Sequence, residues 1–192
     1  LVTLMVGRTV KATYQHEDAP ESFENEEELF AVKNLSRRDG KVRDVSFAVH
    51  RGEIVGFSGL VGSGRSEMMN AIFGAEPKSA GQVLLKGKPV RIRSPYGAIK
   101  NGMAMVTENR RETGFFHNFD IKQNISILPF IKTSFWGGAG GLTSGKFEKQ
   151  CAAEQKESLN IKCHSIDQGI TELSGGNQQK VILGKWLAAD SQ

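Results

Sequence analysis

Residues 53–67 read Glu-Ile-Val-Gly-Phe-Ser-Gly-Leu-Val-Gly-Ser-Gly-Arg-Ser-Glu. The apolar run Ile54–Phe57 predicts a buried strand, the glycines after it predict a tight turn, and residues 66–73 predict a helix. From Gly59 onward the spacing is that of a phosphate-binding loop, with arginine in the position where lysine is expected. The residues predicted to bind phosphate are therefore Gly59, Leu60, Val61, Gly62, Ser63, Gly64, Arg65, Ser66 and Glu67.

This spacing suits a phosphate group for two physical reasons. Glycine has no Cβ, so backbone N–H groups can crowd around an anion, and the positive end of the following helix points at the same place. The hydroxyl of Ser66 would then reach a Mg²⁺ ion held by the nucleotide. The alternative, on spacing alone, is a strand-turn-helix corner that uses glycine only for its geometry.

A second stretch, residues 173–180, reads Leu-Ser-Gly-Gly-Asn-Gln-Gln-Lys and precedes an amphipathic helix that runs to Ala188. Ser174 followed by two glycines makes another helix N-terminus that suits a phosphate. The stretch resembles the signature motif of ATP-binding-cassette (ABC) ATPases. Because both motifs stand in the family's order, the resemblance favours the phosphate loop over the simple corner. The signature residues are Leu173, Ser174, Gly175, Gly176, Asn177 and Gln178.

Further stretches sharpen this resemblance. The chain is similar to the sugar-import ATPases of the ribose, galactoside and arabinose type, which carry two cassettes on one polypeptide, and it looks like the second cassette. Residues 107–116 and 159–164 are most similar to D-allose import ATPases. The other residues that carry the likeness are Met5–Arg8, Gly59–Ser66, Arg93, Ser94, Pro95, Ala98, Ile99, Gly102 and Glu108.

The resemblance implies an α/β fold of the P-loop NTPase class, the ABC-type ATP-binding cassette with a mixed sheet core. Residues 1–10 would be the tail of a preceding cassette, residues 11–28 an acidic linker, and residues 29–192 a partial ATP-binding domain. The family continues after the signature helix with an apolar strand that ends in Asp-Glu, and with a switch histidine. The sequence stops at Gln192, so we expect an incomplete cassette that does not turn over ATP in isolation.

Local patterns predict the elements of this fold. Residues 29–35 and 42–49 alternate as the strands of a hairpin, and residues 82–92 read as a strand pair that turns at Lys86-Gly87-Lys88. Ser94-Pro95 begins a short helix through Ile99, and residues 103–106 read as a short buried strand. A helix is expected over 146–159, and a helical subdomain over about 122–188.

The resemblance also implies a mechanism in which ATP and Mg²⁺ are the cofactors. Each nucleotide is held between the phosphate loop of one cassette and the signature motif of the other. Ser174 and Glu108 are the expected catalytic residues, since Glu108 stands where many cassettes carry a glutamine that contacts Mg²⁺. The alternative for Glu108 is a carboxylate at a strand end that pairs with Arg110 or Arg111. An adenine-stacking aromatic is lacking from the first hairpin, where residues 37–39 are Arg-Arg-Asp.

The expected function is the ATP-binding component of a monosaccharide importer, peripheral at the cytoplasmic face of the inner membrane. Its partners would be the first cassette of the same polypeptide, transmembrane permease subunits and, indirectly, a periplasmic sugar-binding protein. The aromatic-rich residues 115–136 fall where the family receives the membrane subunits, although ordinary core packing also explains them. Two other classes stay open, namely a degenerate non-catalytic cassette that serves as a scaffold and a soluble regulatory NTPase.

Composition limits the classes of partner and of location that the sequence supports. The formal net charge of +4 is spread over interleaved acidic and basic residues, so no nucleic-acid partner is indicated. Cys151 and Cys163 have no metal-like set of partners and are predicted to be free thiols of a cytosolic protein. No apolar run approaches the length that spans a membrane.

Overall fold

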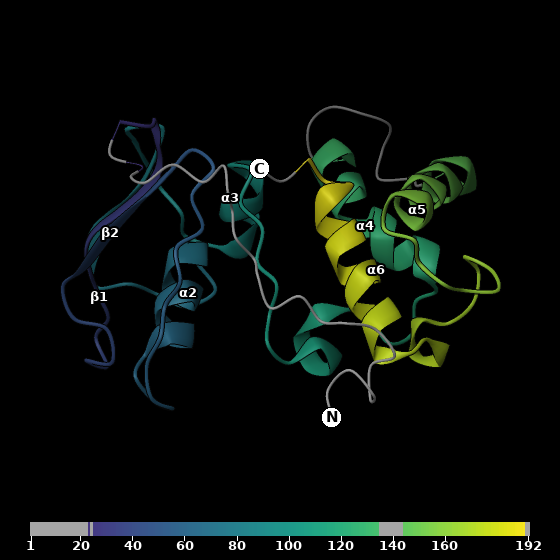
Figure 1. Ribbon diagram of the computed structural model, residues 1–192, viewed down its shortest axis with the longest axis horizontal. Helices are drawn as coiled ribbons and strands as arrows, with labels where there is room; N and C mark the ends of the chain where they lie inside the picture. The colour runs from purple at the N-terminus through teal and green to yellow at the C-terminus, as the bar shows by residue number, and fades with distance from the viewer. Residues whose placement is uncertain (1–22, 24, 135–143, 191–192) are drawn as a thin grey trace, which may run out of the picture.

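The computed structural model describes residues 23, 25–134 and 144–190. They divide into a β-rich half, which carries helices α2 (Arg65–Phe73) and α3 (Pro95–Lys100), and a half built from longer helices (Figure 1). The predicted tail, residues 1–10, and most of the predicted linker, residues 11–28, lie outside the described residues.

The sheet has four strands in the order β2-β1-β3-β4, and every neighbouring pair is antiparallel. Its strands are β1 (Glu28–Ser36), β2 (Val45–His50), β3 (Ala80–Leu85) and β4 (Lys88–Val90). Both predicted hairpins are confirmed. Val32 of β1 lies between Phe47 of β2 and Val83 of β3, and Val32 and Val83 are fully buried. The next residues, Ala31 in β1 and Leu84 in β3, are buried as well, so both faces of the sheet are covered at these positions.

Two predicted strands are not strands in the structure. Ile54–Phe57 and Met103–Val106 have no ladder of backbone hydrogen bonds, and all four described strands belong to the antiparallel sheet. The side chain of Ile54 is 91% exposed and that of Val106 is 44% exposed. A strand exists only with a hydrogen-bonded neighbour, and no described segment pairs with either run. The prediction that they are buried strands was therefore wrong for the described residues.

Helices α2 and α3 form where the sequence predicted them. In α2, Met68, Ala71, Ile72 and Phe73 are buried, and Met69 is half-buried. The Oγ of Ser94 accepts a hydrogen bond from the Gly97 N–H at 3.3 Å and so caps α3, with proline in its first turn.

The helical half contains α4 (Ile121–Ser134), α5 (Gly145–Ser158) and α6 (Gly175–Leu187), which pack on one another (Figure 1). Two short turns flank them, the π-helical η1 (Arg110–Gly114) and the 3₁₀-helical η2 (Ile170–Glu172). Asn124 is 1% exposed, and its side chain accepts from the Phe116 N–H at 2.8 Å, which fastens the loop before α4. None of the helices in the described ranges is long and apolar enough to cross a membrane.

Helix α6 joins the two halves. The Trp186 ring meets the Phe73 ring of α2 edge to face, with 5.9 Å between centroids. The ammonium of the buried Lys185 donates to the carbonyl of Gly114 in η1 at 2.6 Å. Through these two contacts, a displacement of α6 would move both η1 and α2.

Burial of Lys185 gives the fold a pH dependence. Burial lowers the pKa of Lys185 to about 8, whereas an unfolded chain titrates its lysines near pH 10.4. Between these values the unfolded state binds more protons, so this group makes stability rise with pH. From pH 8 to pH 10, we expect the free energy of unfolding to rise by about 2 kcal/mol relative to a Lys185→Met variant. Urea titrations of both proteins would measure the difference, and a difference that is constant with pH would contradict it.

Candidate functional site

The glycine turn before α2 is built so that only glycine fits at its last position. Gly64 has a φ of +88°, and a Cβ on it would lie 2.5 Å from the carbonyl oxygen of Lys41. No side chain caps the N-terminus of α2. The first N–H groups of the helix are therefore directed to a site that an anion can fill.

A cavity of about 640 Å³ lies beside this helix start. It brings the predicted phosphate-loop residues Arg65 and Ser66 together with Glu108, the predicted catalytic carboxylate. The full lining is Phe57, Arg65, Ser66, Met69, Asn70, Met105, Val106, Thr107, Glu108 and Thr113. One cation and several oxygen donors therefore share the cavity with the helix start, and oxygen donors are the ligands that Mg²⁺ prefers.

The carboxylate of Glu108 makes no ion pair in the part of the chain that the structure describes. Arg110 meets Glu108 only through the backbone, where its N–H donates to the Glu108 carbonyl at 3.1 Å. The guanidinium of Arg110 instead donates to Oε1 of Gln178 at 3.3 Å. The alternative that Glu108 pairs with Arg110 or Arg111 is therefore not what the structure shows.

The start of α6 is fixed by a buried glutamine on its inner side and is exposed on its outer side. Gln178 is 5% exposed, and its amide donates to the carbonyls of Ile170 and Leu173 at 3.3 and 3.1 Å. Ser174, the N-cap residue, is exposed, and its Oγ accepts from the Asn177 amide at 3.0 Å. A Cβ on Gly176 would meet nothing within 4 Å. The signature residues thus present an exposed hydroxyl and an open backbone.

The structure does not bring the two predicted catalytic residues into one site. Glu108 lines the cavity at the start of α2, and Ser174 is absent from that lining. Arg110 is the link between the two regions, because a Cβ on Gly175 would lie 2.6 Å from its Nη2. Sequence reasoning considered Arg110 only as a partner for Glu108, and no local motif marks its contact with α6.

The hairpin loop contributes two further residues at the glycine turn. The Arg37 guanidinium pairs with Asp39 at 2.8 Å and with Glu76, and it donates to the Glu67 carbonyl at 3.3 Å. Arg37 therefore ties the loop to α2 and is not free to stack on a base. Lys41, which sequence reasoning missed, holds the Glu67 carboxylate at 2.9 Å, and this bond lowers the pKa of Glu67. No sequence motif connects Lys41 to the turn, so only the fold reveals it.

The aromatic residues of the expected docking region have different environments. Phe115 is buried, whereas Phe116 is 52% exposed and stacks on the half-buried Phe119 at a centroid distance of 5.1 Å. Phe135 and Trp136 lie outside the described residues. Core packing thus accounts for Phe115, and Phe116 remains as an exposed aromatic.

The comparison with protein families decides the assignment, because the family described as ABC transporter matches residues 42–192. The chain belongs to the ABC transporter family. It is 50% identical over 188 residues to the D-allose import ATP-binding protein AlsA of Escherichia coli K12, covering 97% of this chain and 37% of that protein. It is 38% identical over 192 residues to the ribose import ATP-binding protein RbsA of a Bacillus cereus strain, covering 100% of this chain and 37% of that protein.

Another relative of this ABC family chain is the arabinose import ATP-binding protein AraG of Vibrio parahaemolyticus, at 40% identity, with 99% of this chain and 36% of that protein covered. The chain thus spans little more than a third of the length of these relatives.

Solved structures confirm the predicted fold class. A nucleotide-free ATP-binding cassette from an ABC transporter superposes with a TM-score of 0.68 at 20% identity, over 85% of this chain and 66% of that one. A dimeric cassette in a post-hydrolysis state, bound to ADP and Pi, gives a TM-score of 0.65 at 21% identity, over 84% and 70% of the two chains. The ABC family chain therefore has the ATP-binding cassette fold.

Proposed function

We propose that this chain is the ATP-binding component of an ABC importer for a monosaccharide, which couples ATP binding and hydrolysis to sugar uptake. The observation that carries the proposal is the cavity that joins the uncapped start of α2, Ser66 and Glu108. The names of the relatives, which are import ATP-binding proteins for D-allose, ribose and arabinose, support the substrate class.

The residues of the cavity suit Mg²⁺ and ATP in distinct ways. The N–H groups at the start of α2 would bind phosphate, and Arg65 adds positive charge with a guanidinium that is larger and differently directed than an ammonium. The Ser66 hydroxyl and the Glu108 carboxylate would hold Mg²⁺, which neutralises charge on the phosphates during transfer. The uncapped helix start and the strict requirement for glycine at position 64 fit this use.

We further propose that the signature residues serve a different nucleotide from the one at Gly59–Ser66. Ser174 and Gly176 face open space and lie outside the cavity of Glu108, which fits a face-to-face pairing with a second cassette. That partner would be the first cassette of the same polypeptide, since the named relatives are much longer than this chain. The assembly would sit at the cytoplasmic face of the inner membrane, joined to transmembrane permease subunits, and a periplasmic sugar-binding protein would deliver the sugar.

Nucleotide binding by the chain tests the proposal. Titration with fluorescent ATP should show weak binding, at sub-millimolar to millimolar levels, that strengthens when Mg²⁺ is added. Ser66→Ala removes a proposed oxygen ligand of Mg²⁺ and should weaken the Mg²⁺-dependent binding by about tenfold or more, because loss of even an outer-shell partner of a bound metal typically costs about 10–100-fold in affinity. Ser158→Ala, at an exposed serine at the end of α5, is the matched control. Absence of binding at millimolar ATP would favour a scaffold that does not use nucleotide.

A further inference from the structure

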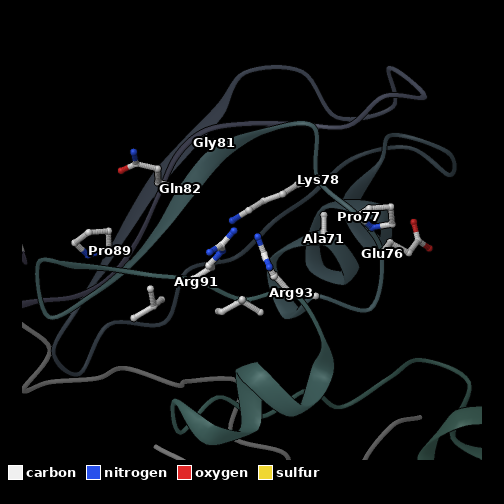
Figure 2. A pocket seen from close by; sticks show the side chains of 12 residues that line it. Ala71, Glu76, Pro77, Lys78, Gly81, Gln82, Pro89, Arg91 and Arg93 are labelled. Atoms are coloured by element: carbon white, nitrogen blue, oxygen red, sulfur yellow. The ribbon is translucent and has the colours of Figure 1, made fainter.

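A second pocket, of about 480 Å³, lies at the far end of α2 from the glycine turn (Figure 2). It is formed by the C-terminal end of α2, the loop that follows, the start of β3, and the segment that leaves β4. The lining of this pocket shares no residue with that of the candidate nucleotide cavity, although Asn70 of the cavity donates to Glu76 of this pocket at 3.3 Å. The pocket is therefore a separate site from the candidate nucleotide cavity.

Three cations line this pocket, namely Lys78, Arg91 and Arg93. Figure 2 shows their nitrogen ends pointing toward one another in the centre of the pocket, although they come from two different segments. Among the described residues, none of the three makes an ion pair or a side-chain hydrogen bond. Burial also lowers the pKa of Lys78, as expected for an ammonium with no anion beside it.

The lining offers no unpaired carboxylate that could balance this charge. Glu76 is the only carboxylate in the lining, and it is engaged by Arg37 and by the Asn70 amide at 3.3 Å. Figure 2 shows the Glu76 side chain apart from the three cations. The C-terminal end of α2 contributes a partial negative charge of about half a unit, which is small beside three positive charges. The cluster therefore keeps a net positive charge that an anionic ligand can neutralise.

Glycine allows the cationic segment to lie close to α2. Gly74, at the end of α2, has a φ of +77°, and a Cβ there would lie 2.8 Å from the backbone nitrogen of Ser94. The backbone of residues 92–94 thus packs directly against the helix end. Arg91 and Arg93 flank the buried Ile92 in this segment, and both arginines are exposed.

The remaining walls indicate a ligand larger than an inorganic ion. Apolar groups face the pocket from several elements, and its volume lies within the range of small-molecule sites. Guanidinium groups bind phosphate oxygens in pairs, which makes a phosphate group the best match for two arginines and a lysine. The apolar wall residues are Ala71, Pro77, Pro89, Val90 and Ile92.

We propose that this pocket binds a small organic phosphate, a phosphate monoester on a body about the size of a monosaccharide. The phosphate contacts Lys78, Arg91 and Arg93, and the body rests on the apolar wall. Nucleotide at the glycine turn and organic phosphate at this pocket can be bound at the same time, because the two linings share no residue.

Calorimetric titration with glucose 6-phosphate tests the proposal, in the presence of saturating Mg²⁺ and ATP so that the glycine turn is filled. We expect saturable binding that is at least tenfold tighter than that of inorganic phosphate and absent for glucose. Equal affinity for inorganic phosphate and glucose 6-phosphate would show that the organic part of the ligand adds nothing to binding, and this result would contradict the proposal. Binding to vesicles that contain phosphatidic acid, without binding to glucose 6-phosphate, would contradict the proposal of a soluble ligand and would indicate a lipid headgroup instead.

Matched variants separate the pocket from general surface charge. The double variant Arg91→Gln/Arg93→Gln should lose at least tenfold in affinity, because each lost charged hydrogen bond to phosphate has about that effect. Lys86→Gln/Lys88→Gln removes the same charge from the adjoining hairpin, where the two lysines are as exposed as the arginines but lie outside the lining, and should bind as the wild type does. Equal losses in the two variants would overturn the assignment. If the arginine variant unfolds by circular dichroism, Lys78→Gln gives the same test alone.

Discussion

Ser174→Arg should reduce both ATP hydrolysis and sugar uptake by about a hundredfold or more in the proposed importer, assembled with its membrane subunits. Ser174 is exposed at the N-terminus of α6, where its Oγ accepts from the Asn177 amide, so that its hydroxyl can still donate to the nucleotide of the proposed opposing cassette. A long cation in that position would keep the two cassettes from closing. Thr171→Arg, at an exposed residue of the preceding η2 turn, is the matched control and should retain most activity.

The comparison with Arg65→Ala tests which of the two proposed nucleotide sites, the one at the loop of this chain or the one covered by its signature residues, hydrolyses ATP. Arg65 belongs to the predicted phosphate loop of this chain, where its guanidinium is larger and differently directed than the ammonium of the expected lysine, so its loss should reduce ATP hydrolysis less than Ser174→Arg does. ATPase assays on both variants, reconstituted with the membrane subunits, would decide the order. If Arg65→Ala proved the more harmful, the loop of this chain would be the working site, and the proposed division of roles would be wrong.

Gly64→Ala should weaken nucleotide binding by more than tenfold, for a reason that is visible in the backbone. An alanine in the left-handed region costs roughly 1–2 kcal/mol, and here its Cβ would also lie 2.5 Å from the Lys41 carbonyl. The turn or the hairpin loop must shift, and with it the N–H groups at the start of α2. ATP titration measures the loss of affinity, and urea denaturation measures the loss of stability.

Gly102→Ala is the matched control for Gly64→Ala. Gly102 also has a left-handed φ, of +81°, but a Cβ there would meet nothing within 4 Å, and the residue is outside the nucleotide cavity. Gly102→Ala should lower the free energy of unfolding through backbone strain and leave the affinity for ATP unchanged. Equal effects of the two substitutions on ATP affinity would show that the contact with Lys41 has no part in holding the glycine turn.

The elements that the sequence predicted correctly are those whose signals are local. The two hairpins and the capped helix α3 are encoded within short runs, where turn residues and alternating apolar positions lie side by side. The strand predictions at Ile54–Phe57 and Met103–Val106 were wrong because strand formation depends on a neighbour, which no apolar run specifies by itself.

The candidate site was predictable to the same extent. The glycine spacing located Arg65 and Ser66, and the family resemblance located Glu108; the structure places these three residues in one cavity. The contacts of Lys41 and Arg110 were not predictable, because each joins segments that are far apart in the chain without any motif. The cationic pocket is of the same kind, since its lysine and arginines come together only when α2 packs against the end of β4.

The proposed role of this chain is to use ATP to drive the import of a monosaccharide. Its most direct test is the rate of ATP hydrolysis by the complete importer in liposomes, with its sugar-binding protein supplied empty or loaded with D-allose, ribose or arabinose. We predict that one loaded form raises the rate several-fold over the empty form and that the same sugar accumulates in the liposomes. A rate that none of these sugars changes, with no sugar accumulated, would contradict the claim.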